Sequence, residues 1–320
     1  MDYEELLKNC EPGRIDRRQL LHAFGVTATA AFATAALPAF ARQGTNGKRT
    51  FPHTHVNHLG YAVADYAKSR DFYIDLFGVR DAWDDGKGSG VEFGDIKRPN
   101  GIYIRPAGKP GAKASVGHIA YGMDDFMANK AAIKAEIERR GMQVRPDGYA
   151  GWSVNDPAGY MIQFTPVKSD AMYPGASPLC PEPGPSEKCK AGHEAGLKNL
   201  ASMPKPSGKG LRAYAISPIA FHVPDIAKEK EFYTNVMGMK VLSEDANEVV
   251  LGFGQNTLNL RTATGDKPYV ERFGLLVENY DDAKVKAELD RRGLNPQRAG
   301  KLGWSIKDPD GYTIEVSGRR

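Results

Sequence analysis

The chain has 320 residues, of which 41% are hydrophobic and 26% charged, and its formal net charge is +4. This composition is that of a globular protein long enough for two domains. Because Lys and Arg are scattered among acidic residues, with no basic run interleaved with aromatics, the sequence argues against nucleic acid as a partner.

The first 41 residues have the pattern of an export signal. An Arg-Arg pair at positions 17 and 18 precedes an Ala-rich stretch that ends in Ala39-Phe40-Ala41, a small-x-small cleavage site. We expect a twin-arginine signal peptide over 1–41 and a periplasmic or extracellular location. A membrane anchor is the alternative, but the stretch is too rich in Ala and Thr for a good span. No stable membrane insertion is therefore expected after cleavage.

The chain then repeats a strand followed by an amphipathic helix. The segment VNHLGYAVAD, from residue 56, matches ISPIAFHVPD, from residue 216, and the helix patterns AKSRDFYIDLFG and AKEKEFYTNVMG follow them. Asp65 and Asp225 stand at N-cap positions, and Gly78 and Gly238 stand where a C-cap glycine belongs. Two further predicted strands follow each helix.

Each half restarts with the same plan. VGHIAYGMDDFMANKAAIKAEIERRG and ERFGLLVENYDDAKVKAELDRRG each predict a strand and a helix, and an Asp-Pro-x-Gly-Tyr turn leads to the last strand of each half. The repeats predict an α+β protein of four β-α-β-β-β units in two pairs. We expect the pairs over 51–167 and 214–320, joined by a linker over 168–213 that is rich in Pro, Gly, Ser and Lys.

Two cysteines, Cys180 and Cys189, lie in this linker, whereas Cys10 would leave with the signal peptide. In an oxidising compartment the pair could close a small loop. The alternative is a metal pair with His193, but nothing nearby completes a set of four ligands. The sequence leaves open whether the two cysteines are bridged.

The repeated motifs resemble those of the vicinal oxygen chelate superfamily. The motifs are His-Leu-Gly-Tyr-Ala-Val-x-Asp with Phe-Tyr and Leu-Phe-Gly after it, His-Ile-Ala-Tyr-Gly-Met-Asp-Asp, and Asp-Pro-Ala-Gly-Tyr-x-Ile-Gln. That superfamily includes glyoxalase I, extradiol dioxygenases, fosfomycin-resistance enzymes and bleomycin-binding proteins. The resemblance implies that each pair of units closes into a sheet-lined cup whose inner strands carry metal ligands. It is less specific for the reaction, because one scaffold hosts many chemistries.

The resemblance places three metal ligands in the first half, namely His58, His118 and Gln163. Strand periodicity supports this, because each of the three shares a strand face with small or polar neighbours that leave room for a bound molecule. Pairing of units within the first half would bring the three together, whereas exchange between halves would not. We therefore expect consecutive pairing.

The second half differs at the same positions, where it has Pro218, Arg272 and Glu315, so we expect its metal site to be lost. In the first half Gln163 departs from the arrangement of two His and one carboxylate that holds Fe(II). Its amide oxygen carries no charge, so weaker metal binding or a more electrophilic metal should follow. The resemblance to glyoxalase I implies a further ligand near the end of the first unit, for which Tyr103 and Glu92 are the candidates.

Three residues are candidates for contact with substrate. They are Tyr103, Arg105, whose counterpart in the second half is Arg261, and His222 near the end of a strand. For the arginines the alternative is an ordinary solvated charge. His53 and His55, which precede the first strand, are expected to belong to a flexible lead-in, and the alternative is that they cap the mouth of the cup.

These features predict an exported metalloprotein that binds Fe(II) or Mn(II), with Zn(II) or Ni(II) as alternatives. Its partner would be a small molecule chelated through two vicinal oxygens, and extradiol-type ring cleavage is the favoured reaction. The site of extradiol enzymes usually lies in the second pair of units, whereas the histidines here lie in the first. A glyoxalase-like lyase or isomerase, which needs a carboxylate base, and a non-catalytic binding protein are the alternatives. Monomer and homodimer both remain open.

Overall fold

The computed structural model describes residues 51–95, 98–109, 111–147, 151–166 and 210–319. The predicted signal peptide, both linker cysteines and most of the predicted linker lie outside these residues. Within the described part of the chain no helix has the length and apolar character needed to cross a membrane.

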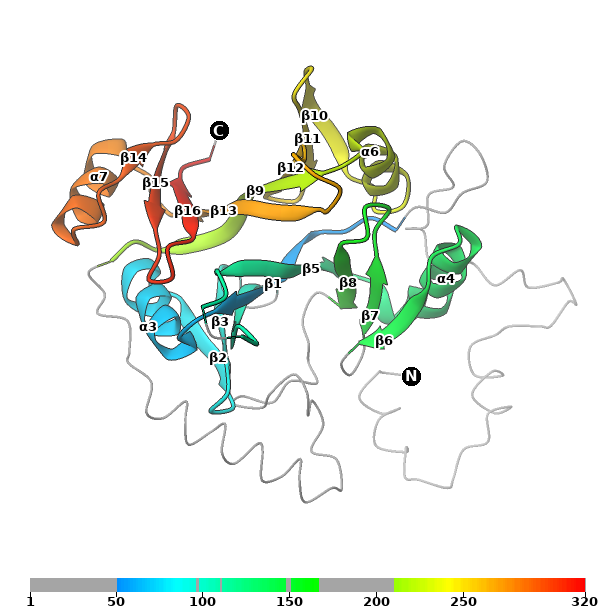
Figure 1. The fold of residues 1–320 in the computed structure, drawn as a ribbon, viewed down its shortest axis with the longest axis horizontal. Helices are drawn as coiled ribbons and strands as arrows, with labels where there is room; N and C mark the ends of the chain where they lie inside the picture. Colours follow the sequence, from blue (N-terminus) through cyan, green and yellow to red (C-terminus); the bar gives the residue numbers. More distant parts are fainter. Residues whose placement is uncertain (1–50, 96–97, 110, 148–150, 167–209, 320) are drawn as a thin grey trace, which may run out of the picture. The chain divides into compact units, whose positions relative to one another are not determined.

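The first half of the described chain forms an eight-stranded mixed sheet with two helices (Figure 1). The strand order is β2-β3-β4-β1-β5-β8-β7-β6, so the two units meet where β1 pairs with β5. The elements are β1 (His55–Val63), α3 (Tyr66–Phe77), β2 (Arg80–Asp84), β3 (Ser89–Phe93), β4 (Asn100–Pro106), β5 (Ser115–Met123), α4 (Phe126–Arg139), β6 (Val144–Asp147), β7 (Gly151–Asn155) and β8 (Met161–Pro166).

The second half repeats this sheet with the order β10-β11-β12-β9-β13-β16-β15-β14. The elements are β9 (Ala213–Val223), α6 (Ile226–Asn235), β10 (Lys240–Glu244), β11 (Glu248–Phe253), β12 (Asn256–Thr262), β13 (Tyr269–Val277), α7 (Asp282–Arg291), β14 (Gln297–Arg298), β15 (Gly303–Lys307) and β16 (Thr313–Ser317). Each sheet is built from strands of one half, which is the consecutive arrangement. The predicted fold class, with two paired domains of β-α-β-β-β units, is confirmed.

The helix caps follow from local sequence. The Asp65 carboxylate accepts hydrogen bonds from the backbone N–H groups of Ala67 and Lys68, both at 3.1 Å, and so starts α3. Gly78 ends the helix in the left-handed region, at φ 59°. In the second half Asp225 caps α6 as predicted, but the helix ends at Asn235, before Gly238.

Hydrogen bonds from buried tyrosines join the two halves. The hydroxyl groups of Tyr61 and Tyr73 both donate to the carboxylate of Asp308, in the Asp-Pro-x-Gly-Tyr turn of the second half. The reciprocal bond runs from the hydroxyl of Tyr233 to Asp156, in the same turn of the first half, at 3.0 Å. The face of β1 that carries Tyr61 is therefore buried against the second half, and the opposite face, which carries His58, remains for a site.

Candidate functional site

Two histidines meet on the inner face of the first sheet. In the antiparallel pairing of β1 with β5, His58 lies opposite Ala120 and Gly60 lies opposite His118, so the two histidines are diagonal neighbours. Their Nε2 atoms are 3.1 Å apart and their rings are perpendicular. The structure therefore brings together two of the three predicted ligands through the atoms that bind metals.

A glycine makes room for this contact. A Cβ atom at Gly60 would lie 2.0 Å from Cε1 of His118, closer than any real contact, so the imidazole occupies the space above the glycine. The corresponding residue in the second half is Ala220, where the partner strand has no histidine. The glycine thus belongs to the site although it carries no functional group.

The neighbouring residue Asn57 orients His58. The Oδ1 atom of Asn57 lies 2.9 Å from Nδ1 of His58, and its Nδ2 donates to the carbonyl of Pro166. This arrangement makes Nδ1 of His58 the donor and leaves a lone pair on Nε2, as a metal-binding imidazole requires. Burial lowers the pKa of His118 to about 4, and burial together with the neighbouring His118 also lowers the pKa of His58. Both rings are therefore neutral at pH 7.

Gln163 completes the group from β8. This strand runs parallel to β5, with Gln163 opposite Ala120, and the Gln163 side chain hydrogen-bonds His58, which raises the pKa of that histidine. Two imidazole nitrogens bound to one ion at about 2.1 Å and at a right angle are about 3.0 Å apart, close to the observed separation. The residues present thus fit a divalent ion with two imidazoles and one amide. No cluster of three His, Cys, Asp or Glu occurs in the part of the chain that the structure describes.

The aromatic ring of Tyr103 covers one side of His58. The two rings are stacked with centroids 3.9 Å apart, and Trp83 packs edge-on against Tyr103. Burial, together with the nearby charge of Glu92, raises the pKa of the Tyr103 hydroxyl, which therefore stays protonated at neutral pH. The predicted position of Tyr103 beside the histidines agrees with this geometry, although its ring face rather than its oxygen meets His58.

The other two candidate substrate contacts are placed differently. The Arg105 guanidinium lies 3.0 Å from the Asp85 carboxylate and stacks over Trp83. His222 stacks on Tyr269, and its Nε2 lies 3.3 Å from Glu271. Each side chain thus has protein partners in the described structure, and His222 does not line the cavity of its own domain.

The expectation of a flexible lead-in at His53 and His55 is wrong. Their exposed fractions are 6% and 5%. The backbone N–H groups of Phe51 and His53 donate to the carbonyls of Val236 and Met237, and the Phe51 side chain is buried. The segment before β1 is therefore held against the second half. Its fixed position depends on these contacts with residues distant in sequence.

In the second domain an ion pair occupies the corresponding positions. The guanidinium of Arg272, which replaces the histidine of β5, binds the carboxylates of Glu315 and Glu271. Pro218, which replaces the first histidine, offers no donor atom. The positive charge that a metal would bring is therefore already supplied by the protein.

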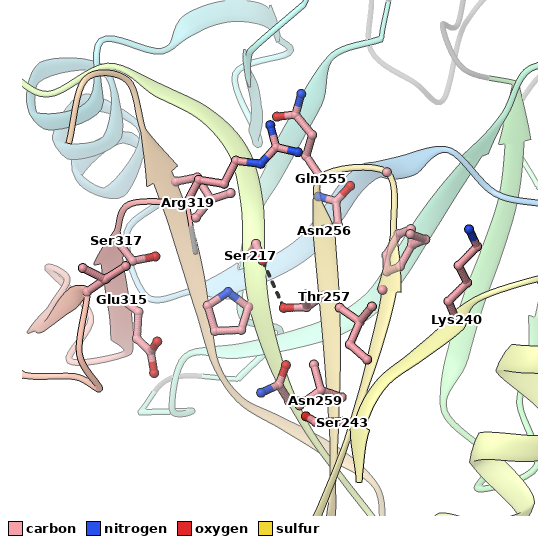
Figure 2. A pocket seen from close by; sticks show the side chains of 18 of the residues that line it. Ser217, Lys240, Ser243, Gln255, Asn256, Thr257, Asn259, Glu315, Ser317 and Arg319 are labelled. Atoms are coloured by element: carbon pink, nitrogen blue, oxygen red, sulfur yellow. Dashed lines mark hydrogen bonds between the residues drawn. The ribbon is translucent and has the colours of Figure 1, made fainter.

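The inner face of the second sheet also contains a cavity of about 670 Å³ (Figure 2). Side chains of Ser217, Thr257, Asn259 and Glu315 line it, from β9, β12 and β16. The family resemblance implied a cup in this half, but the sequence analysis named none of these lining residues as candidates for ligand contact. The run of small and polar residues on one face of these strands was the signal that could have revealed it.

The comparisons with known proteins identify the family. The sequence profile of the Glyoxalase/Bleomycin resistance protein/Dioxygenase superfamily matches residues 55–164 and 215–316. The chain belongs to this superfamily. The two profile matches coincide with the two sheets, so each domain of this superfamily member matches the family profile once.

The chain is similar in sequence to a lactoylglutathione lyase and in fold to a glyoxalase and a 2,3-dioxygenase. The lactoylglutathione lyase GLX1 of Arabidopsis thaliana is 30% identical over 118 residues, which cover 31% of this chain and only 42% of that protein. The Mn(II)-bound glyoxalase of Novosphingobium aromaticivorans has a TM-score of 0.60 at 18% identity, covering 84% of this chain and 83% of that one. The 2,3-dioxygenase LapB of Pseudomonas sp. KL28 has a TM-score of 0.59 at 15% identity, covering 84% and 93%. At such identities the structures establish the fold alone.

Proposed function

We propose that this chain is a metal-dependent enzyme whose first domain holds Fe(II) or Mn(II) through His58, His118 and Gln163. Its substrate would be a small molecule with two adjacent oxygen atoms. The observation that carries the proposal is the 3.1 Å approach of the two Nε2 atoms, with His58 held in the metal-binding tautomer by Asn57. A bound ion would supply Lewis acidity to the two substrate oxygens.

The charge of the ligand set favours a substrate that binds as an oxyanion. Two neutral imidazoles and one amide contribute no negative charge, whereas the usual set of two histidines and a carboxylate contributes one. Anionic oxygens of a catechol would supply the missing negative charge. For this reason we propose extradiol-type ring cleavage as the reaction.

Aromatic side chains would shape the substrate position. Tyr103 lies flat on His58 and Trp83 supports it from the edge, so the Tyr103 ring covers this side of the site. The Tyr103 hydroxyl, which burial keeps protonated, can donate a hydrogen bond but cannot act as a base at neutral pH. These residues would position a planar substrate rather than transfer its protons.

One observation favours a second reaction, a glyoxalase-like isomerisation. The Glu92 side chain, on β3, is 25% exposed, and its charge raises the pKa of Tyr103. Glu92 pairs with Gly101, which in turn pairs with His58 across the next strand. A carboxylate placed two strands away from His58 on the same sheet is a candidate base for removing a proton next to a carbonyl.

The test begins with metal content. Purified protein is reconstituted with Fe(II) or Mn(II) without oxygen, desalted and subjected to elemental analysis, with His58→Ala as the test variant and His222→Ala as the matched control. We expect about one ion per chain in the wild type and in the control, as the single site requires, and loss of the ion in His58→Ala. Absence of metal from all three would leave a non-catalytic binding protein as the function.

The loaded protein then separates the two reactions. Oxygen uptake with simple catechols would support ring cleavage. Exchange with solvent of a hydrogen atom bound to the carbon next to a carbonyl group would instead support an isomerase. Glu92→Gln should then abolish this exchange.

Export is the remaining part of the proposal. The Arg-Arg pair and the small-x-small sequence at 39–41 support a twin-arginine signal. Replacing Arg17 and Arg18 together by Lys should retain the chain in the cytoplasm, as cell fractionation would show. Unchanged export of that variant would contradict this assignment.

A further inference from the structure

We propose that the cup of the second domain is a separate, metal-free binding site for an uncharged amphiphilic molecule that carries hydroxyl groups. The proposal does not depend on the metal site of the first domain. Its starting point is the cavity of about 670 Å³ on the inner face of the second sheet. This volume lies within the range of pockets that bind small molecules, roughly 300–1,000 Å³.

The charges at the centre of this cup are balanced by the protein itself. Glu315 lines the cavity, and its carboxylate binds Arg272, which also binds Glu271. Because Glu315, the carboxylate of this group that lines the cavity, is paired with Arg272, a charged ligand would find no unpaired opposite charge at the centre. Lys240 and Arg319 also line the cavity, but both are exposed to solvent. The interior therefore suits an uncharged molecule.

A buried amide oxygen in the cavity wall lacks a hydrogen-bond partner within the part of the chain that the structure describes. The Nδ2 atom of Asn259 donates to Glu248, which also binds Arg261, and this fixes the orientation of the amide. The Oδ1 atom of Asn259 is then buried and has no hydrogen-bond partner among the residues of the described structure. Buried acceptors are normally satisfied, so this atom calls for a donor such as a ligand hydroxyl.

Two hydroxyl groups in the same wall can complete the recognition. Ser217, on β9, and Thr257, on the neighbouring strand β12, have their hydroxyl oxygens 3.0 Å apart, as the dashed line in Figure 2 marks. One hydrogen bond joins them, so one of the two hydroxyl hydrogens remains available. The wall thus offers both an acceptor and a donor to a hydroxylated ligand.

Apolar side chains lie at the mouth of the cup. Leu242, on β10, and Leu302, before β15, both line the cavity, and they are 60% and 40% exposed. Leu242 extends over Gly252, since a Cβ atom there would lie 2.6 Å from its Cδ1. Two exposed leucines at the rim of a polar cavity favour a ligand with an apolar part that covers them.

The experiment uses 2,7-dihydroxynaphthalene as the probe, with the full-length protein and with a chelator present. The probe is fluorescent, uncharged and amphiphilic, and its hydroxyl groups are too far apart to chelate a metal ion. We expect saturable binding to one site per chain. Asn259→Leu should weaken binding about ten-fold, the effect of one buried hydrogen bond.

Two further variants and an anionic analogue of the probe complete the experiment. Leu242→Ser changes an exposed side chain, so it should fold normally, and it should weaken probe binding several-fold. His58→Ala, in the other domain, should bind the probe as the wild type does. The anionic analogue 6-hydroxynaphthalene-2-sulfonate should bind more weakly than the probe.

Several results would overturn the proposal. They are absence of saturable binding, loss of binding in His58→Ala, unchanged affinity in both second-domain variants, or tighter binding of the sulfonate. A change of oligomeric state in Leu242→Ser with unchanged probe affinity would assign this rim to contact between copies of the chain. Failure of the metal proposal alone would leave these binding results unchanged.

Discussion

The Arg272 guanidinium binds the Glu315 carboxylate at the two positions where the first domain has His118 and Gln163. This relationship accounts for the difference between the two copies of the terminal strand. In the second domain a carboxylate balances a positive charge that the protein itself provides. In the first domain the two side chains are neutral, and the positive charge can come from a bound ion.

Gln163→Glu should tighten metal binding. The new carboxylate would add a negative charge to a set of neutral donors, and about a ten-fold lower Kd is expected if the interaction with the ion gains about 1.4 kcal/mol. Competition with a fluorescent chelator measures this affinity. The matched control is Glu315→Gln, the reverse change in the second domain, which should leave metal affinity unchanged. An unaltered Kd in Gln163→Glu would exclude Gln163 as a ligand.

The same control has its own effect on stability. Glu315→Gln leaves Arg272 with Glu271 as its carboxylate partner, and the side-chain exposure of the broken pair is only 21% and 13%. We expect the free energy of unfolding to fall by about 1–3 kcal/mol, less than for a fully buried pair. Asp290→Asn, which breaks an exposed pair with Lys286, should cost less than about 0.5 kcal/mol. Equal losses in urea denaturation would mean that the Arg272 pair is no stronger than a surface pair.

Gly60→Ala tests whether the imidazole pair depends on the space above the glycine. The added methyl group would overlap the His118 ring, so the ring must move and the two Nε2 atoms must separate. We expect loss of metal binding and destabilisation of about 1–3 kcal/mol from overpacking. Ala220→Gly, the reverse change in the second domain, should leave metal binding intact. Retention of a full complement of metal by Gly60→Ala would show that the histidines do not meet in this way.

The repeats account for how much of the architecture could be predicted. Matching motifs, capping residues such as Asp65 and the alternation of strand residues define the units and which side chains face inward. They place His58, His118 and Gln163 on one surface because strand pairing then leaves little freedom. Export and the linker cysteines remain predictions.

Other features depend on contacts between residues distant in sequence. The order of His53 follows from hydrogen bonds to the segment after α6, nearly two hundred positions away. The partners of Arg105 and His222 belong to neighbouring strands and loops whose register a single sequence does not specify. The resemblance implied a cup in the second half, but its polar lining was not predicted because it is contributed by many small side chains from several strands.

A buried carboxyl pair makes the stability depend on pH. Glu229, on α6, is 1% exposed, and burial followed by the charge of Asp156 raises its pKa from 4.5 to about 9. Burial also raises the pKa of Asp156, to about 6, although the hydroxyl of Tyr233 donates to its carboxylate. At pH 7 the folded protein therefore keeps a proton on Glu229 that the unfolded chain has lost.

The sign of the dependence follows from proton counts. Between pH 4.5 and about 9 the folded state binds more protons than the unfolded state, so stability falls as pH rises, by at most about 1.4 kcal/mol per pH unit for this group. Glu229→Gln replaces the protonated acid by a neutral side chain of similar shape, so it should flatten this slope and stabilise the protein most at pH 9. Glu136→Gln is the matched control, because Arg139 lowers the pKa of that buried glutamate and its effect should be constant from pH 6 to 9. The free energy of unfolding is measured at each pH by denaturation. If it changes with pH equally in the wild type and in Glu229→Gln, Glu229 is ionised in the folded protein.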